Sequence, residues 1–158
     1  MAQKAIQDWY PDHLNHCYGC GSLNPHGLGI RSYWQGDRAV ATFTPHPFHL
    51  GPPGYVYGGL LASLVDCHAN ATACAAAYQA AGREPGSEPL LRFMTAALRI
   101  DYLRPTPIDG VLELEGRVRE ATPRKAVVEV TIVVAGELCV RGEVVSVLAP
   151  ERFLRPPP

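Results

Sequence analysis

"PPGYVYGGLLASLVDCHANATACAAAY", residues Pro52–Tyr78, is the stretch on which the fold depends. A Pro-Gly turn leads to a pair of glycines, after which small apolar residues dominate for more than twenty positions. Gly82 then suits the left-handed position that ends many helices. We therefore predict one buried helix over 58–81, whose many alanines let a β-sheet approach it closely.

Segments on both sides of this helix alternate apolar and polar residues with a period of two, which is typical of β-strands. Before the helix, a turn of sequence QGD joins two strands that we expect at 28–34 and 38–44. After the helix we expect an antiparallel meander of four strands, at 96–102, 111–120, 126–134 and 138–148. The predicted class is α+β, with one long central helix wrapped by one curved antiparallel sheet.

The 158 residues, 47% hydrophobic and 18% charged, suit one globular domain. We assign 1–27 to an irregular N-terminal segment packed on the domain, 28–150 to the domain itself and 151–158 to a frayed tail. A net charge of −1 favours neither nucleic acid nor an anionic membrane as partner, and no apolar run is long enough to span a membrane. Five cysteines without a disulfide framework, and no recognisable signal peptide, lead us to expect a cytoplasmic protein.

A narrow polar stripe runs along the apolar helix, formed by Ser63, Asp66 and Asn70 at spacings of three and four residues. Burying an unpaired carboxylate is unfavourable, so Asp66 must face partners, water or a cleft. Asp66 is then either a structural acid bonded to a neighbouring loop, or a general base or nucleophile in a pocket. The spacing of the residues does not decide between these two roles.

The helix opens on Gly58 and Gly59, whose amides have no acceptor in a preceding turn and lie at the positive end of the helix dipole. Because glycine has no side chain, these amides can hold a carbonyl oxygen that becomes an oxyanion. Asp66 lies about 12 Å further along the helix axis, at 1.5 Å per residue. One carbonyl cannot contact both groups of one helix, so we predict a symmetric homo-oligomer with helices side by side and sites shared between chains.

Three segments carry a resemblance to a known family. CYGCGSLNPHGLGI at Cys17–Ile30 is similar to the opening of many of its members. HLGPPGYVYGGLLASLVDC at His49–Cys67 resembles their loop, Gly-Gly pair and helical acid, and is the most specific of the three. TAALRIDYLRPTP at Thr95–Pro107 is similar to their following strand, which ends in Tyr-x-x-Pro. The chain thus resembles the hotdog-fold acyl-CoA thioesterases of the phenylacetyl-CoA thioesterase-like group.

The resemblance implies a hotdog fold and the hydrolysis of an acyl-CoA thioester to the free acid and CoA, with no cofactor. It gives Asp66 the role of base or nucleophile, and Thr95 the role of positioning the water. It gives the Gly58 amide, with Gly59 beside it, the role of oxyanion donor. The family usually forms dimers, often paired into tetramers, so the resemblance implies a homodimer or homotetramer, in agreement with the helix geometry.

Two positions depart from the family pattern. Tyr57 stands where the residue before the Gly-Gly pair is usually His, so a non-catalytic acyl-CoA binder stays open as an alternative. Strand alternation also puts Thr95 on the face of Arg99 and Asp101, away from Leu98. Either a β-bulge or a site at the end of the strand would reconcile this placement with a role in the site.

Histidines near these motifs raise further possibilities. His49 lies in the loop before the helix, and hotdog hydratases and dehydratases use a loop His with a helical acid, which gives a second alternative function. His68 is expected at the rim of the pocket. Adjacent helical residues point about 100° apart, so the His68 imidazole does not serve the thiol of Cys67. We interpret Cys67 as a small packing residue. The predicted substrate-binding residues are Tyr57, Gly59, His49 and His68.

Cys17 and Cys20 form a Cys-x-x-Cys pair with three histidines nearby: His13, His16 and His26. Cysteine and histidine are the ligands that zinc prefers, but structural zinc usually takes two such pairs at set spacing. We therefore expect a loop packed against the fold here, and no metal.

Overall fold

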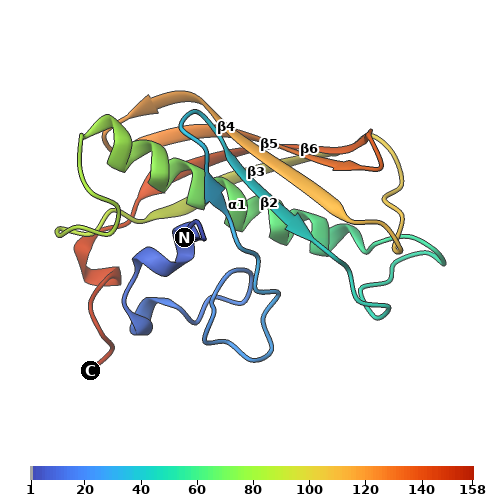
Figure 1. Cartoon of the computed structure of the whole chain (residues 1–158), viewed down its shortest axis with the longest axis horizontal. Helices are drawn as coiled ribbons and strands as arrows, with labels where there is room; N and C mark the ends of the chain where they lie inside the picture. Colours follow the sequence, from blue (N-terminus) through green and yellow to red (C-terminus); the bar gives the residue numbers. More distant parts are fainter. Residues whose placement is uncertain (1) are drawn as a thin grey trace.

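The computed structural model of the chain describes residues 2–158. A six-stranded antiparallel sheet curves around one long helix, α1 (Gly58–Ala80), as Figure 1 shows. Its strands are β1 (Tyr33–Trp34), β2 (Ala39–Phe43), β3 (Phe93–Tyr102), β4 (Leu112–Thr122), β5 (Lys125–Val134) and β6 (Glu137–Leu148). Three short 3-10 helices accompany them: η1 (Ile6–Trp9), η2 (Asp12–Leu14) and η3 (Glu151–Phe153). The predicted α+β class and the central helix are confirmed.

The order of strands in the sheet is β1-β2-β4-β5-β6-β3, which corrects the predicted four-strand meander. Strands β4, β5 and β6 do form a meander, but β3 pairs with β6 rather than with β4. One edge of β4 is already occupied by β2 and the other by β5, so β3 cannot pair with β4 and joins the sheet at its far edge, beside β6. The connection after β3 therefore crosses the whole width of the meander.

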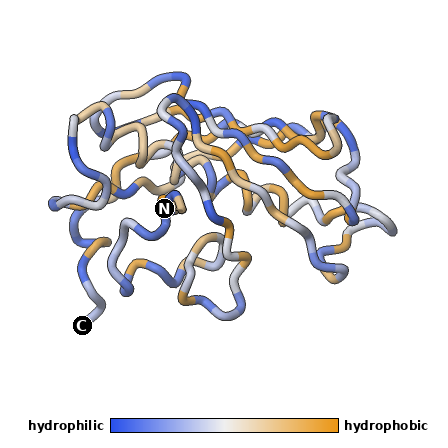
Figure 2. Tube along the Cα trace, viewed as in Figure 1, coloured by the Kyte–Doolittle hydropathy of each residue, from blue (hydrophilic) through white to orange (hydrophobic). Residues whose placement is uncertain are grey.

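The core lies between α1 and the concave face of the sheet. Buried and more exposed residues alternate most clearly along β5, in which every second residue is buried: Ala126, Val128, Val130, Ile132 and Val134. Hydrophobic and hydrophilic residues alternate along the strands in Figure 2. None of the helices formed by residues 2–158 is both long and apolar enough to cross a membrane.

Two strand glycines let the helix lie close to the sheet. A Cβ on Gly116 of β4 would lie 2.3 Å from Thr72 Oγ1, and a Cβ on Gly142 of β6 would lie 2.4 Å from Val65 Cγ1. Contacts this short force the backbone or the helix to move. These two glycines therefore set the depth at which α1 sits in the sheet.

Gly142→Ala is expected to lower the free energy of unfolding by about 1–3 kcal/mol, because the added methyl overpacks the contact with Val65. Val65→Ala on its own removes buried methyl groups and is also destabilising. In the double variant the new methyl occupies part of the space that Val65 leaves. The double variant should therefore lose less unfolding free energy than the two single variants together. Urea denaturation of all four proteins measures this coupling, and strict additivity would contradict the proposed contact.

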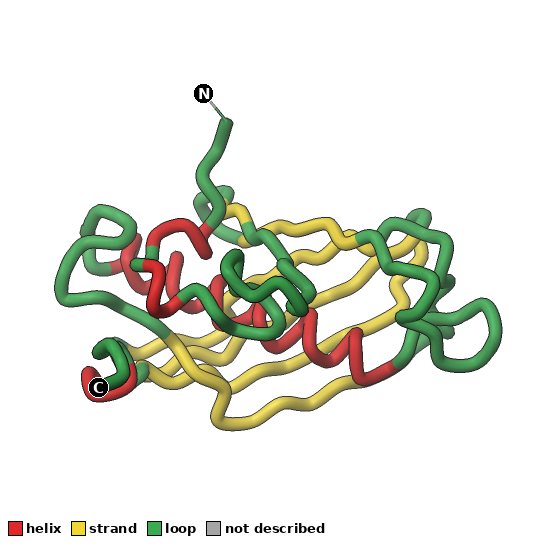
Figure 3. Tube along the Cα trace, turned by 90° about the horizontal axis from the view of Figure 1, so that it is seen from below, coloured by secondary structure: helices red, strands yellow, loops and turns green. Residues whose placement is uncertain are grey.

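The N-terminal segment lies across the side of α1 that faces away from the sheet (Figures 1 and 3). The Ile6 amide donates to the Ser32 carbonyl at 2.8 Å, and the Ile30 amide donates to the Gly19 carbonyl at 3.0 Å. Because 28–32 pairs with this segment, the first predicted strand shortens to β1. At the other end, His13 Nε2 lies 2.8 Å from the carbonyl of Leu154, a residue of the expected frayed tail, so this part of the tail contacts the N-terminal segment.

Candidate active site

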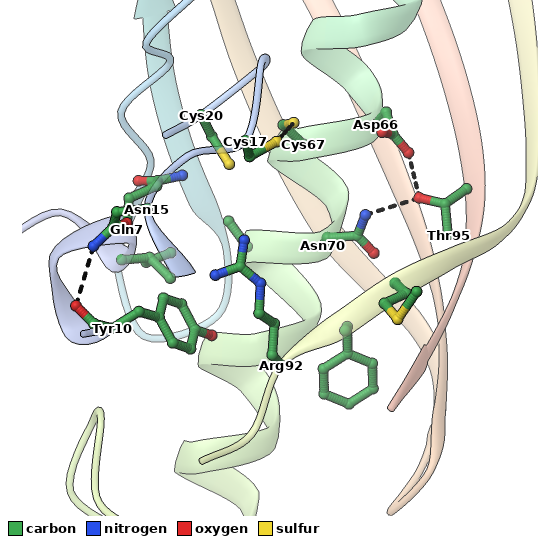
Figure 4. Close-up of a pocket in the computed structure, with 14 residues that line it drawn as sticks. Gln7, Tyr10, Asn15, Cys17, Cys20, Asp66, Cys67, Asn70, Arg92 and Thr95 are labelled. Atoms are coloured by element: carbon green, nitrogen blue, oxygen red, sulfur yellow. Dashed lines mark hydrogen bonds between the residues drawn. The ribbon is translucent and has the colours of Figure 1, made fainter. Parts of the chain in front are cut away.

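A cavity of about 260 Å³ opens between the N-terminal segment, the middle of α1 and the first residues of β3 (Figure 4). Asp66 and Asn70 reach it from α1, Thr95 from β3, and Asn15 from the N-terminal segment. Arg92 lines it next to β3 and is held by a hydrogen bond from Nη1 to the Leu14 carbonyl at 2.9 Å. The cavity is therefore polar on the side where the carboxylate lies.

Asp66, Thr95 and Asn70 form a hydrogen-bonded chain in this cavity (Figure 4). The Thr95 hydroxyl donates to Asp66 Oδ1, and Asn70 Nδ2 donates to Thr95 Oγ1 at 2.8 Å. Asn70 follows Asp66 by one helical turn, so both project from the same side of α1. These hydrogen bonds fix the orientation of the Asp66 carboxylate. No hydrogen bond within residues 2–158 uses its second oxygen, Oδ2. A carboxylate held in this way can accept a proton from water or attack an electrophilic carbon.

A β-bulge in β3 turns Thr95 toward the helix. The partner of Thr95 is Ser146 and that of Ala97 is Val145, so Ala96 is the extra residue on the bulged strand. This shift places Thr95 opposite Ser146, on the same inner face of the sheet as the buried Val144. Of the two explanations that the sequence left open for Thr95, the structure has the bulge.

The other predicted site residues lie elsewhere in the same chain. Tyr57, Gly59 and His49 line a second, open pocket of about 350 Å³ at the start of α1. Gly58 lies beside Tyr102, whose hydroxyl donates to the Gly58 carbonyl at 2.8 Å. Within one chain, neither the helix start nor His49 lines the Asp66 cavity.

His68 does not lie at the rim of the pocket, as the sequence led us to expect, but is fully buried. Its Nδ1 lies 2.8 Å from Ser32 Oγ, and its Nε2 lies 3.2 Å from the Ala39 carbonyl. The carbonyl can only accept, so Nε2 carries the proton and the Ser32 hydroxyl donates to Nδ1. Burial lowers the pKa of His68 to about 4, so the ring is neutral at neutral pH. It is a core residue that ties α1 to β2.

Two features of the cavity were not assigned to the site from the sequence. Asn70 was recognised as part of the polar stripe, but its bond to Thr95 depends on the bulge in β3, which no local pattern reveals. Cys17 and Cys20 were read only as a pair, whereas the structure brings Cys67 of α1 next to them on the wall of the cavity. Cys67 directly follows Asp66 in the sequence, and this adjacency was the signal that could have placed Cys67 near the site.

Comparisons with known proteins agree with this architecture. Residues 53–140, more than half of the chain, match the family model of the thioesterase superfamily. An acyl-coenzyme A thioesterase THEM4 of Xenopus laevis is 33% identical over 88 residues, which cover 56% of this chain and 34% of that protein. The match thus spans about a third of the length of this relative.

Solved structures extend the match to the fold. A thioesterase superfamily protein from Shewanella loihica PV-4 is 49% identical, with a TM-score of 0.63 over 79% of this chain and 95% of that chain. The PaaI protein of E. coli, from the phenylacetic acid degradation operon, is 26% identical, with a TM-score of 0.59 over 76% of this chain and 83% of that one. The hotdog fold expected from the sequence is confirmed, and the chain belongs to the thioesterase superfamily.

Proposed function

We propose that this protein hydrolyses an acyl-CoA thioester, with Asp66 as general base or nucleophile. The observation that carries the proposal is the Asp66 carboxylate, which lines a cavity and is held there by the Thr95 hydroxyl. The acyl-CoA class of substrate is supported by the similarity to an acyl-coenzyme A thioesterase of Xenopus laevis. Under this proposal Thr95 and Asn70 orient the carboxylate for the reaction, since the Thr95 hydroxyl donates to Asp66 and Asn70 donates to Thr95.

The proposed reaction follows one of two routes. In the first, Asp66 takes a proton from water while the water oxygen attacks the thioester carbon, the carbon–sulfur bond breaks, and the CoA thiolate receives the proton. In the second, an Asp66 oxygen attacks the carbon, CoA leaves and takes a proton from solvent, and water hydrolyses the mixed anhydride to restore the carboxylate. Both routes place negative charge on the carbonyl oxygen, which a backbone amide at Gly58 would stabilise.

We further propose that this amide comes from a second copy of the chain. β3 is an edge strand of the sheet, and its exposed side chains include Met94, Leu98 and Tyr102. An edge with unpaired backbone groups and exposed apolar residues favours pairing with another strand. Because α1 packs against β3, antiparallel β3–β3 pairing about a two-fold axis would bring two helices side by side, with Gly58 of one near Asp66 of the other.

Wild-type protein is expected to be a dimer or larger, and Leu98→Glu should shift it toward a 17.1 kDa monomer. A charge buried at this edge would raise the dissociation constant roughly tenfold to a hundredfold, at 1.4 kcal/mol per factor of ten. Light scattering and sedimentation over a range of concentrations measure the shift, and turnover should fall with the dimer fraction. Phe153→Glu, at an exposed residue outside the sheet, is the control. A fully active monomer would contradict the shared site.

A panel of acyl-CoAs tests the reaction itself, by following release of the free CoA thiol. An apolar cavity of about 460 Å³ shares Phe93 with the Asp66 cavity, so we expect activity with apolar acyl groups. An enoyl-CoA hydration assay is run in parallel, because His49 would serve that reaction. Hydration without thiol release would favour the hydratase alternative, and binding without either reaction would favour a non-catalytic binder.

A further inference from the structure

Three cysteine thiols meet on the wall of the Asp66 cavity. Cys17 and Cys20 come from the N-terminal segment, and Cys67 comes from α1. Their three sulfur atoms lie within 4.8 Å of one another, and the sulfurs of Cys17 and Cys67 are 3.7 Å apart. No other His, Cys, Asp or Glu ligand atom among residues 2–158 joins this group.

The local backbone is shaped to bring the Cys-x-x-Cys turn onto the helix. A Cβ on Gly19 would lie 2.3 Å from Cys67 Sγ, so only glycine lets the turn approach that sulfur. The turn is closed by a hydrogen bond from the Gly21 amide to the Cys17 carbonyl at 2.8 Å. A Cβ on Gly21 would lie 2.4 Å from the Cys17 amide nitrogen, so a side chain is excluded there as well.

The electrostatics of the cluster favour one thiolate but not three. Hydrogen bonds from the thiols of Cys20 and Cys67, and from the amides of Cys20 and Gly19, hold the pKa of Cys17 far below its usual range. The hydrogen bond with Cys17, together with burial, raises the pKa of Cys20 to about 12. Hydrogen bonds with Cys17 and Cys20 raise the pKa of Cys67. Because a metal ion binds cysteine as the thiolate, binding of a cation here would release the protons that the thiols still hold.

We propose that Cys17, Cys20 and Cys67 bind a zinc ion that fastens the N-terminal segment to α1 beside the Asp66 cavity. Zinc–sulfur bonds of about 2.3 Å at tetrahedral angles place two ligand sulfurs about 3.8 Å apart, and the Cys17–Cys67 distance of 3.7 Å agrees with this. Three thiolates leave one tetrahedral position for water, and all three cysteines line the cavity of about 260 Å³. Binding of zinc at this site does not depend on whether the protein hydrolyses thioesters.

The metal content of the full-length protein tests this site directly. After incubation with one equivalent of ZnCl2 and extensive dialysis under reducing conditions, mass spectrometry of the metal should give about one zinc per chain. Cys17→Ser, Cys20→Ser and Cys67→Ser should each lower the retained zinc at least tenfold. Cys139→Ser is the matched control, because Cys139 is buried in β6, far along the chain from the cluster, and should retain the wild-type amount.

Cobalt replacement provides a second measurement that uses only the wild-type chain. Co²⁺ bound by three thiolates should give thiolate-to-cobalt charge-transfer absorption and the intense visible bands of a tetrahedral site, and both should disappear on adding zinc. Less than a tenth of an equivalent of retained zinc, together with no cobalt bands, would overturn the proposal. A Cys17–Cys67 disulfide in protein kept in air, with no zinc bound after reduction, would overturn it in favour of a redox pair.

Discussion

Asp66→Asn is expected to lower turnover of acyl-CoA by at least ~10²-fold while the protein stays folded. The amide has the same size as the carboxylate and can still accept the Thr95 hydrogen bond through its oxygen. It can neither take a proton from water nor attack the thioester. Steady-state thiol release at saturating substrate measures the loss, and circular dichroism verifies the fold.

Asp109→Asn is the matched control, because Asp109 is an exposed residue in the turn before β4. Its turnover should stay near that of the wild type. A folded Asp66→Asn variant with near-normal turnover would refute the proposed chemistry. Loss of activity in His49→Ala but not in Asp66→Asn would instead favour the hydratase alternative.

Gly58→Val is expected to reduce turnover by at least ~10²-fold, because it blocks the amide proposed to bind the oxyanion. A Cβ at this position would lie only 3.3 Å from the Tyr102 ring, so the branched side chain has to extend over the start of the helix. Tyr57→Phe should reduce turnover by no more than roughly tenfold, since it removes at most one neutral hydrogen bond of ~0.5–1.5 kcal/mol. Stopped-flow or steady-state thiol release compares the two variants.

Tyr57 also gives the test that separates an enzyme from a binder. It is 59% exposed in the open pocket at the helix start, where its ring covers Gly59. Calorimetry measures acyl-CoA binding independently of hydrolysis. If the wild type binds acyl-CoAs without cleaving any of them, and Tyr57→His cleaves them, the protein is a binder and the proposed function is wrong.

The helix and the strands were predictable from local patterns, and the site was only partly so. The Gly-Gly pair, the apolar run and Gly82 defined α1 to within one residue, because caps and periodicity are properties of consecutive residues. The place of β3 beside β6 depends on which strand edges are already paired, and that is decided across the whole sheet. A period-two pattern contains no such information.

Two residues on α1 show the same limit at the level of single side chains. His68 was expected at the rim of the pocket, but Ser32 and Ala39 satisfy both of its ring nitrogens inside the core. Cys67 was expected to be inert packing, and only the fold reveals that Cys17 and Cys20 lie beside it. In both cases the deciding partners are more than twenty-five residues away in the sequence.

The place of β3 at the far edge also governs when the site can form during synthesis. Asp66 and Thr95 emerge from the ribosome early, but among the strands formed by residues 2–158 only β6 hydrogen-bonds to β3, and β6 ends at Leu148. Contacts between segments so distant in the sequence form late in folding. A nascent chain that ends before β6 contains both residues but lacks the strand that holds β3 in the sheet. The carboxylate and its partner hydroxyl are therefore expected to meet only after nearly the whole domain has been translated.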